Sequence, residues 1–151
     1  MADLSPRLAA VVEALPLQPD SRVLEIGCGP GAAARAVADR LTTGHVLAID
    51  RSARAIAQAA AASRDHIASG RLRLRRAAAE DFVLLPEDEP FDIVFAVRLG
   101  ALDGRHPEAG RRALSRIAAA VAPGGRLFVD GGHPLREVSL SLALPSRRWE
   151  L

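Results

Sequence analysis

The stretch VLEIGCGPGAAARAV (residues 23–37) constrains the fold more than any other part of the sequence. An apolar run enters a cluster of glycines and leaves as an alanine-rich pattern, which predicts a buried strand, a tight turn and a helix. Turns of this kind hold a ligand against the N-terminus of the helix. Gly27, Gly29 and Gly31 give G-x-G-x-G, and Ala32 extends this to the dinucleotide form G-x-G-x-x-G/A. The glycines alone therefore do not select the ligand.

Two acids near this turn narrow the choice. Asp50 lies 23 residues after Gly27, at the end of the next predicted strand, where a carboxylate can accept from both hydroxyls of a ribose. Glu25 lies two residues before Gly27, where it would repel a pyrophosphate but attract an ammonium and a sulfonium. S-adenosylmethionine carries those groups and no phosphate. The alternative for Glu25 is a structural acid that pairs with an arginine.

Helical and strand patterns alternate along the chain, and several strands are nearly continuously apolar. This predicts one α/β domain over residues 1–151, with a parallel sheet covered on both faces. We expect helices from about Ser5 to Leu15, from the glycine turn to about Leu41, from Ser52 to Gly70 and from Pro107 to Val121, and strands at Arg22–Ile26, His45–Ile49, Arg71–Arg76, Phe91–Val97 and Arg126–Asp130.

The segment from Val138 to Leu144 alternates apolar and small polar residues, which predicts one more strand. It follows the fifth strand by a turn too short for a helical crossover, so we expect it to pair antiparallel. In the third strand, alternation puts Arg71, Arg73 and Arg75 on one face. We interpret these arginines as protection of a sheet edge rather than as a nucleic-acid track, because no aromatic side chains accompany them.

The composition sets limits on partners and location. All 20 basic residues are arginine and the net charge is only +2, so we expect no nucleic-acid partner. One cysteine, Cys28, excludes an internal disulfide and suits a reducing, cytoplasmic setting. No apolar run approaches the roughly 20 residues that a membrane span needs, so we expect no membrane partner either.

Five motifs in order resemble class I S-adenosylmethionine-dependent methyltransferases. VLEIGCGPG is similar to their first motif, VLAID followed by RS to their acidic second strand, and AAAEDF to the segment beside the adenine. FDIVFAV resembles their fourth strand and VAPGGRLFV their fifth with its lead-in. The likeness runs from about Asp20 to Asp130 and implies a Rossmann-like three-layer fold with the strand order 3-2-1-4-5. The implied cofactor is S-adenosyl-L-methionine and the implied reaction is in-line methyl transfer to an acceptor.

The resemblance assigns cofactor contacts to the matching positions. The methionine part of the cofactor would lie among the acid and the glycines of the turn, and a backbone carbonyl at the end of strand four would accept from its ammonium. The acid of the second strand would bind the ribose. The adenine would lie beside the segment that follows the third strand. These positions are Glu25, Gly27, Gly29, Gly31, Asp50, Arg51, Ala79, Glu80 and Val97. The family often has a further acid before the Ala-Glu-Asp run, where this chain has Ala78, which leaves Glu80 or Asp81 to replace it.

Acceptor chemistry has weaker signals. Asp103, His106 and His133 are candidate proton acceptors because they follow strands four and five. Arg98 would anchor an acidic substrate or pair with a nearby carboxylate. The four histidines show no metal-ligand spacing, so we expect no metal site. The Asn/Asp-Pro-Pro-aromatic motif of many N-methyltransferases is replaced by VRLG, and we expect a small-molecule acceptor.

One departure keeps other functions open. The family sheet usually has seven strands, but after Asp130 only 21 residues remain, enough for at most one extra strand. A catalytically degenerate S-adenosylmethionine-binding or interaction domain is therefore the alternative, and an NAD(P)-dependent oxidoreductase is third, disfavoured by Glu25 and by the absence of tyrosine. A poorly covered fifth strand would also leave an edge that a homodimer could bury.

Overall fold

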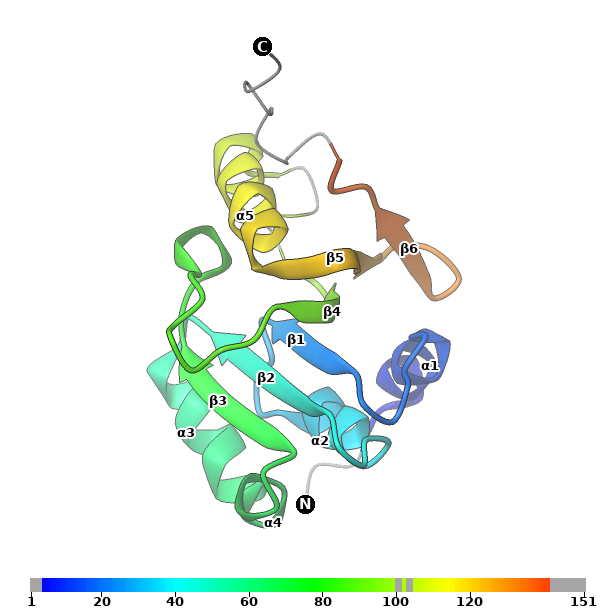
Figure 1. Cartoon of the computed structure of the whole chain (residues 1–151), viewed down its shortest axis with the longest axis vertical. Helices are drawn as coiled ribbons and strands as arrows, with labels where there is room; N and C mark the ends of the chain where they lie inside the picture. Colours follow the sequence, from blue (N-terminus) through cyan, green and yellow to red (C-terminus); the bar gives the residue numbers. More distant parts are fainter. Residues whose placement is uncertain (1–3, 100–101, 103–104, 142–151) are drawn as a thin grey trace.

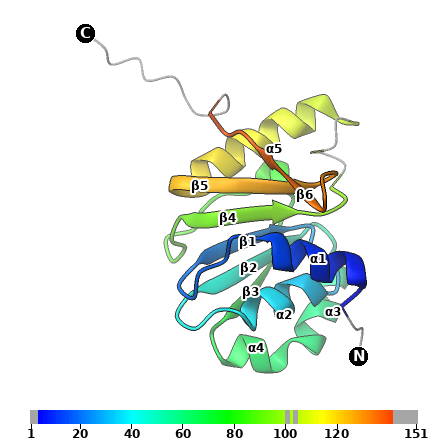
Figure 2. The same ribbon diagram turned by 90° about the vertical axis from the view of Figure 1, so that its right-hand side faces the viewer.

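The computed structural model describes residues 4–99, 102 and 105–141 and contains a six-stranded sheet of order β3-β2-β1-β4-β5-β6 (Figures 1 and 2). Neighbouring strands pair in parallel except β6, which runs antiparallel to β5. The expected α/β class and strand order are thus confirmed. The strands are β1 (Arg22–Ile26), β2 (His45–Asp50), β3 (Leu72–Arg76), β4 (Phe91–Ala96), β5 (Val121–Asp130) and β6 (Leu135–Val138).

Helices cover both faces of this sheet, as the apolar strands predict (Figure 2). One core joins the sheet to the first three helices, and the other joins it to the last helix and a short 3-10 turn. Inward-facing side chains such as Val23 and Leu24 are fully buried on opposite faces. The helices are α1 (Pro6–Ala14), α2 (Ala32–Ala38), α3 (Ala53–Ala62), α4 (Arg64–Ala68) and α5 (Pro107–Ala120), with the 3-10 turn η1 at Ala79–Asp81.

Two helices differ from the expectation. The helix predicted from Ser52 to Gly70 begins as expected, with the Ser52 side chain accepting from Ala55 N, but it breaks at Ser63. Ser63 is fully buried and its hydroxyl accepts a hydrogen bond from Arg35 at 3.0 Å, a tertiary contact that the local pattern does not contain. Helix α2 ends at Ala38 rather than near Leu41, because its final turns tighten into i→i+3 hydrogen bonds.

The C-terminal strand is antiparallel as predicted, but it lies at Leu135–Val138 and not at Val138–Leu144. Asp130 pairs directly with Leu135, so four residues connect the two strands. The pairing of β5 with β6 ends at Val138, where the predicted strand begins. Residues 142–144 lie outside the described ones. Because β6 pairs with β5 from Leu127 to Asp130, that part of the fifth-strand edge is already covered.

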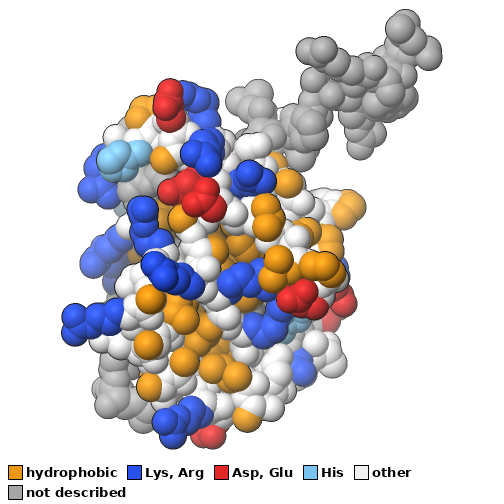
Figure 3. Space-filling model, turned by 90° about the vertical axis from the view of Figure 1, so that its left-hand side faces the viewer, with side chains coloured by type: hydrophobic (Ala, Val, Ile, Leu, Met, Phe, Trp, Pro, Cys, Tyr) orange, Lys and Arg blue, Asp and Glu red, His pale blue; other side chains and the backbone are white. Residues whose placement is uncertain are grey.

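The arginines of β3 have an acidic partner. Arg73 and Arg75 form ion pairs with Asp88 at 2.9 and 2.8 Å, and the Asp88 side chain is fully buried. Hydrogen bonds from Arg75 hold the pKa of Asp88 well below its usual range, against the opposing effect of burial. On the side of the molecule in Figure 3, arginines are interspersed with apolar and acidic side chains. In the described part of the chain, no helix is long and apolar enough to cross a membrane.

Candidate active site

The glycine turn connects β1 to α2 at the carboxyl edge of the sheet, where parallel sheets bind ligands. Gly27, Gly29 and Gly31 have φ values of 74°, 53° and 88°, which L side chains rarely adopt. The backbone N–H groups of Gly27 and Cys28 donate to the carbonyl of Ile49 at 2.8 and 3.0 Å. The turn is therefore fixed to the end of β2 by main-chain bonds.

Asp50, at the end of β2, secures the same turn with its side chain. One carboxylate oxygen accepts from Gly29 N at 2.9 Å, and the other accepts from Ser52 N at 2.8 Å. A carboxylate has about four acceptor positions, so both oxygens keep capacity for a ligand hydroxyl. Asp50 is thus a structural residue of the turn as well as the expected ribose acceptor.

Glu25 is buried in β1, with 4% of its surface exposed. Its Oε1 has no hydrogen-bond partner among the described residues. Burial, and then the nearby Asp50 carboxylate, raise the pKa of Glu25 to about 8. Arg35 makes no ion pair with Glu25; its Nη1 donates to Pro30 O and to the Ser63 hydroxyl instead. Within the described structure, the alternative of a structural Glu25–arginine pair is therefore not observed.

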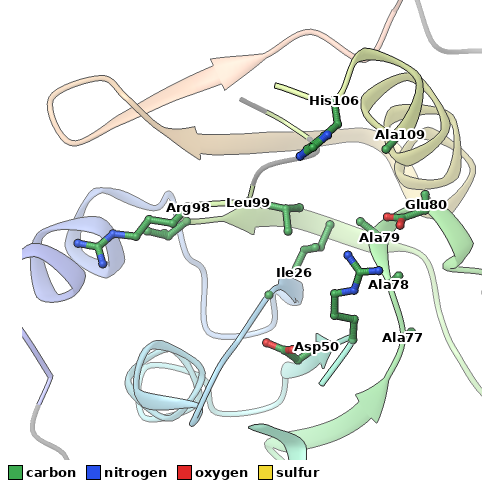
Figure 4. Close-up of a pocket in the computed structure, with 13 residues that line it drawn as sticks. Ile26, Asp50, Ala77, Ala78, Ala79, Glu80, Arg98, Leu99, His106 and Ala109 are labelled. Atoms are coloured by element: carbon green, nitrogen blue, oxygen red, sulfur yellow. The ribbon is translucent and has the colours of Figure 1, made fainter. Parts of the chain in front are cut away.

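Two cavities meet at this edge. The first, of about 490 Å³, contains six of the predicted cofactor residues (Figure 4): Gly27, Asp50, Arg51, Ala79, Glu80 and Val97. The second, of about 560 Å³, lies between the glycine turn and the start of α1 and is lined by Glu25 and Gly29. Gly27, Val97 and Arg98 line both cavities, so the two are contiguous.

Gly31 lines neither of these cavities. A Cβ atom there would lie 3.2 Å from the Cβ of Ala59 and 3.1 Å from Arg35 Nη1, so a side chain would crowd the contact between α2 and α3. The observed reason for this glycine is packing and its positive φ. Cys28 is buried in the turn, and burial raises its pKa to about 12, so its thiol is neutral and unsuited to nucleophilic chemistry.

The acids after β3 separate into two environments. Glu80 lines the first cavity together with Ala78 and Ala79 (Figure 4). Asp81 is exposed and forms an ion pair with Arg112 of α5 at 3.3 Å. Of the two acids expected to replace the missing family acid at Ala78, only Glu80 therefore lines the cavity.

The two candidate proton acceptors among the described residues, His106 and His133, are not brought together. His106 precedes α5 and lines the first cavity (Figure 4). His133 is exposed in the β5–β6 turn and is not among the residues that line either cavity. Asp103 lies outside the described residues. No group of three or more metal-ligating side chains occurs within residues 4–99, 102 and 105–141.

Sequence reasoning missed a contact that joins distant segments. Arg7 of α1 forms an ion pair with Asp130 at 2.6 Å, and Asp130 also accepts from the backbone N–H of Arg98 at 3.1 Å. Asp130 further lines a third cavity, of about 220 Å³, between the ends of β4 and β5. Its position at the carboxyl end of a strand, like that of Asp50, is a signal that could have identified it.

Comparisons with known proteins agree with this geometry. Residues 23–125 match the family model described as a methyltransferase domain. A protein-L-isoaspartate O-methyltransferase of Methylorubrum populi is 38% identical over 136 residues, covering 89% of this chain and 56% of the relative. The chain spans about half the length of such curated relatives.

Solved structures share the fold. A methyltransferase from Thiobacillus denitrificans in complex with S-adenosyl-L-homocysteine has a TM-score of 0.65 and 24% identity, covering 83% of this chain and 48% of that one. The [4+2]-cyclase SpnF has a TM-score of 0.65 and 30% identity, covering 81% and 42%. The family match extends over the glycine turn, the acidic second strand and the sheet that carries them, and on that basis the chain belongs to the class I S-adenosylmethionine-dependent methyltransferases.

Proposed function

We propose that this chain transfers a methyl group from S-adenosylmethionine to a small-molecule acceptor. The observation that carries the proposal is Glu25, a buried carboxyl whose Oε1 has no partner among the described residues and which lines a cavity. A buried polar group without a partner is costly, and a ligand ammonium would satisfy it. The adjoining cavity presents Asp50 for ribose hydroxyls, so the two cavities suit the two ends of this cofactor.

The residues have separate roles in this proposal. Glu25 and the turn residues Gly27 and Gly29 hold the amino-acid tail, with a carbonyl from Val97, and Gly31 allows α2 to pack against α3. Asp50 holds the ribose, while the adenine lies beside Arg51, Ala79 and Glu80. When bound, the cofactor supplies a methyl group on a sulfonium for in-line displacement. The protein contributes alignment and exclusion of water.

Proton removal from the acceptor is assigned to His106. Of the three candidates, it lines a cavity in the described structure, whereas His133 lies exposed in a turn. An imidazole can take a proton near neutral pH, as an oxygen or amine nucleophile requires. We further propose a cytoplasmic location, in keeping with a single cysteine.

We also propose a homodimer. Since β6 already pairs with β5 from Leu127 to Asp130, the edge that two copies would pair on this side of the sheet is that of β6, while the opposite edge, β3, carries arginines. Sedimentation at high protein concentration tests this point. A monomer under those conditions contradicts the proposed dimer.

A second candidate is a domain that binds S-adenosylmethionine without transferring its methyl group. The observation that favours it is the likeness to SpnF, a protein described as a cyclase. One fold serves several reactions, so binding and turnover need separate tests.

The first experiment is calorimetry with S-adenosylmethionine, S-adenosylhomocysteine and NADH. We expect the first two to bind at micromolar levels, about −8 kcal/mol, and NADH not to bind. Asp20→Ala, an exposed acid away from both cavities, is the matched control for Asp50→Ala. Binding of NADH alone contradicts the cofactor assignment. Binding of S-adenosylmethionine with no methylated product from any acceptor pool supports the second candidate.

A further inference from the structure

Arg98 has an unusual backbone conformation. It is the one non-glycine residue with positive φ in the described part of the chain, at 57°. Side chains other than glycine, and to a lesser degree asparagine and aspartate, are disfavoured there, so neighbouring contacts must hold the conformation. Asp130 supplies such a contact by accepting the Arg98 backbone N–H at 3.1 Å. A strained residue at the carboxyl end of β4 indicates a functional position.

The Arg98 side chain is exposed and forms no ion pair with any described residue. The nearest candidate acid, Asp130, is engaged twice, by Arg7 at 2.6 Å and by the Arg98 backbone. Figure 4 shows the Arg98 side chain running from the end of β4 toward α1, away from the wall that Ala79 and Glu80 form. Arg98 therefore lines both main cavities, and its guanidinium extends toward α1 without an ion-pair partner among the described residues.

Two further arginines lie near Arg98. Arg136 lines the third cavity beside Asp130 and is exposed, and Arg7 lines the second. Three arginines thus line the second and third cavities beside two acids, Asp130 and the buried Glu25, which suits a ligand ammonium. The acids of the first cavity, Asp50 and Glu80, are assigned to the cofactor, so an acidic acceptor would match the arginines that are left.

We propose that Arg98 selects a small carboxylic acid as the methyl acceptor and holds its carboxylate where the two main cavities meet. This inference rests on the proposed function of the same site. A planar guanidinium matches a carboxylate through two parallel hydrogen bonds. Leu99 lines the first cavity beside Arg98 and also the third cavity with Leu102 and Val129, and these apolar walls suit a short apolar body attached to that carboxylate. Arg98 is thus a specificity residue and takes no part in proton transfer.

The test uses protein saturated with S-adenosylhomocysteine and titrated by calorimetry with succinate, citrate and the uncharged succinamide. We expect one or both acids to bind and the amide not to bind. Arg98→Gly should weaken the binding of the acids at least about tenfold, and Arg98→Lys by a smaller factor, because the ammonium keeps the charge but loses the paired geometry. Arg116→Ala, an exposed arginine of α5 away from the three cavities, is the control.

A second readout separates selection of the acceptor from a structural role. Glycine adopts positive φ without strain, so Arg98→Gly should raise the melting temperature while it weakens acid binding. A residue kept for stability would show the opposite change in melting temperature. We expect the affinity for S-adenosylhomocysteine to stay within about twofold in both Arg98 variants, because this ligand is assigned to Glu25 and Asp50.

Three results overturn the proposal. If loaded wild-type protein binds neither acid, or binds succinamide equally well, the acceptor is not selected as a carboxylate, although the proposed function stands. If Arg98→Gly weakens S-adenosylhomocysteine tenfold or more, Arg98 serves the carboxylate of the cofactor itself. If wild-type protein fails to bind S-adenosylhomocysteine, the proposed function is wrong and this inference fails with it.

Discussion

The two sides of the ligand-binding edge are built in different ways. On the cofactor side, the glycine turn and both of its acids come from one short stretch, Glu25 to Asp50, joined by bonds from the turn to Ile49 and Asp50, and only the adenine wall and the Val97 carbonyl come from later segments. On the acceptor side, Arg7, Arg98 and Asp130 come from segments up to 123 residues apart. Glu25 of the cofactor side is buried and Asp50 is half-buried, whereas Arg7 and Arg98 of the acceptor side are exposed. Local sequence thus specifies the cofactor, and tertiary placement specifies the acceptor.

This comparison predicts that substitutions on the cofactor side reduce stability and ligand affinity most. Asp50→Ala removes the acceptor for two backbone N–H groups and the expected ribose contact. We expect a loss of about 2–4 kcal/mol in the free energy of unfolding, since hydrogen bonds to a charged group are worth about 1.5–3 kcal/mol each before relaxation. We also expect S-adenosylhomocysteine to bind at least about 100-fold more weakly. Chemical denaturation and calorimetry measure the two effects; unchanged affinity would contradict the assigned role.

Glu25 gives the second-largest effect, and its sign depends on pH. Its pKa is raised to about 8 from an ordinary value of 4.5, so the folded protein binds the extra proton between those values. The stability of the free protein should therefore be highest below about pH 4.5, as far as Glu25 is concerned, and fall as the pH rises through about 8. Glu25→Gln removes this dependence and should be more stable than wild type above pH 8. Denaturation across pH 5–9 measures the difference.

The same substitution should weaken S-adenosylhomocysteine about 10–100-fold, because a charge-assisted bond to the ammonium is lost. In wild type, the affinity should rise with pH until Glu25 is ionised near pH 8, because the ligand ammonium favours the ionised carboxyl. Glu13→Gln changes an exposed glutamate of α1 and serves as the control. If wild-type affinity is flat from pH 6 to 9, Glu25 does not face the ammonium.

The sequence predicts the cofactor side of the site better than the positions that depend on tertiary contacts. Glu25 and Asp50 were identified from the glycine spacing because each lies within or directly after a strand whose end is fixed by the fold. The segment PEDEP (residues 86–90) has the acids and prolines of a solvated loop, yet the Asp88 side chain is buried and forms ion pairs with Arg73 and Arg75. Nothing in PEDEP distinguishes its three acids, and only the loop path over β3 selects Asp88.

The bounds of two elements also differ from the sequence-based prediction. The alternation after Val138 predicted the last strand, but the tight hairpin between Asp130 and Leu135 put it earlier. The break at Ser63 depends on its contact with Arg35, 28 residues away. In each case, a contact outside the local pattern, strand pairing for β6 and a tertiary hydrogen bond for Ser63, set the boundary of the element.

A change on the acceptor side should have a smaller effect on stability and leave the cofactor side intact. Asp130→Ala removes the exposed ion pair with Arg7 and the acceptor for Arg98 N. We expect the free energy of unfolding to fall by at most about 1 kcal/mol, because ion pairs with this degree of exposure contribute little to stability. S-adenosylhomocysteine affinity should change less than about threefold, and amide exchange should quicken in α1. Glu13→Ala, which removes another exposed pair of α1, is the control. A tenfold loss of affinity would show that the two sides are coupled.

The smallest effect is expected from a substitution at Ala78 that restores an acid found in many members of the family. Ala78 lines the first cavity directly before η1, has an extended backbone and provides no side-chain cap for that turn. Ala78→Asp places a carboxylate where the family often has an acid for the adenine amine, and one added hydrogen bond of about 0.5–1.5 kcal/mol corresponds to about two- to tenfold tighter binding. Repulsion from Glu80 and Asp81 opposes the gain in stability and affinity from a new carboxylate. Ala78→Asn caps the turn without adding charge, so we expect it to stabilise the protein but to increase the affinity less than Ala78→Asp does. Greater stability in both variants with no change in affinity would mean that position 78 only caps the turn, and that Glu80 already satisfies the adenine edge.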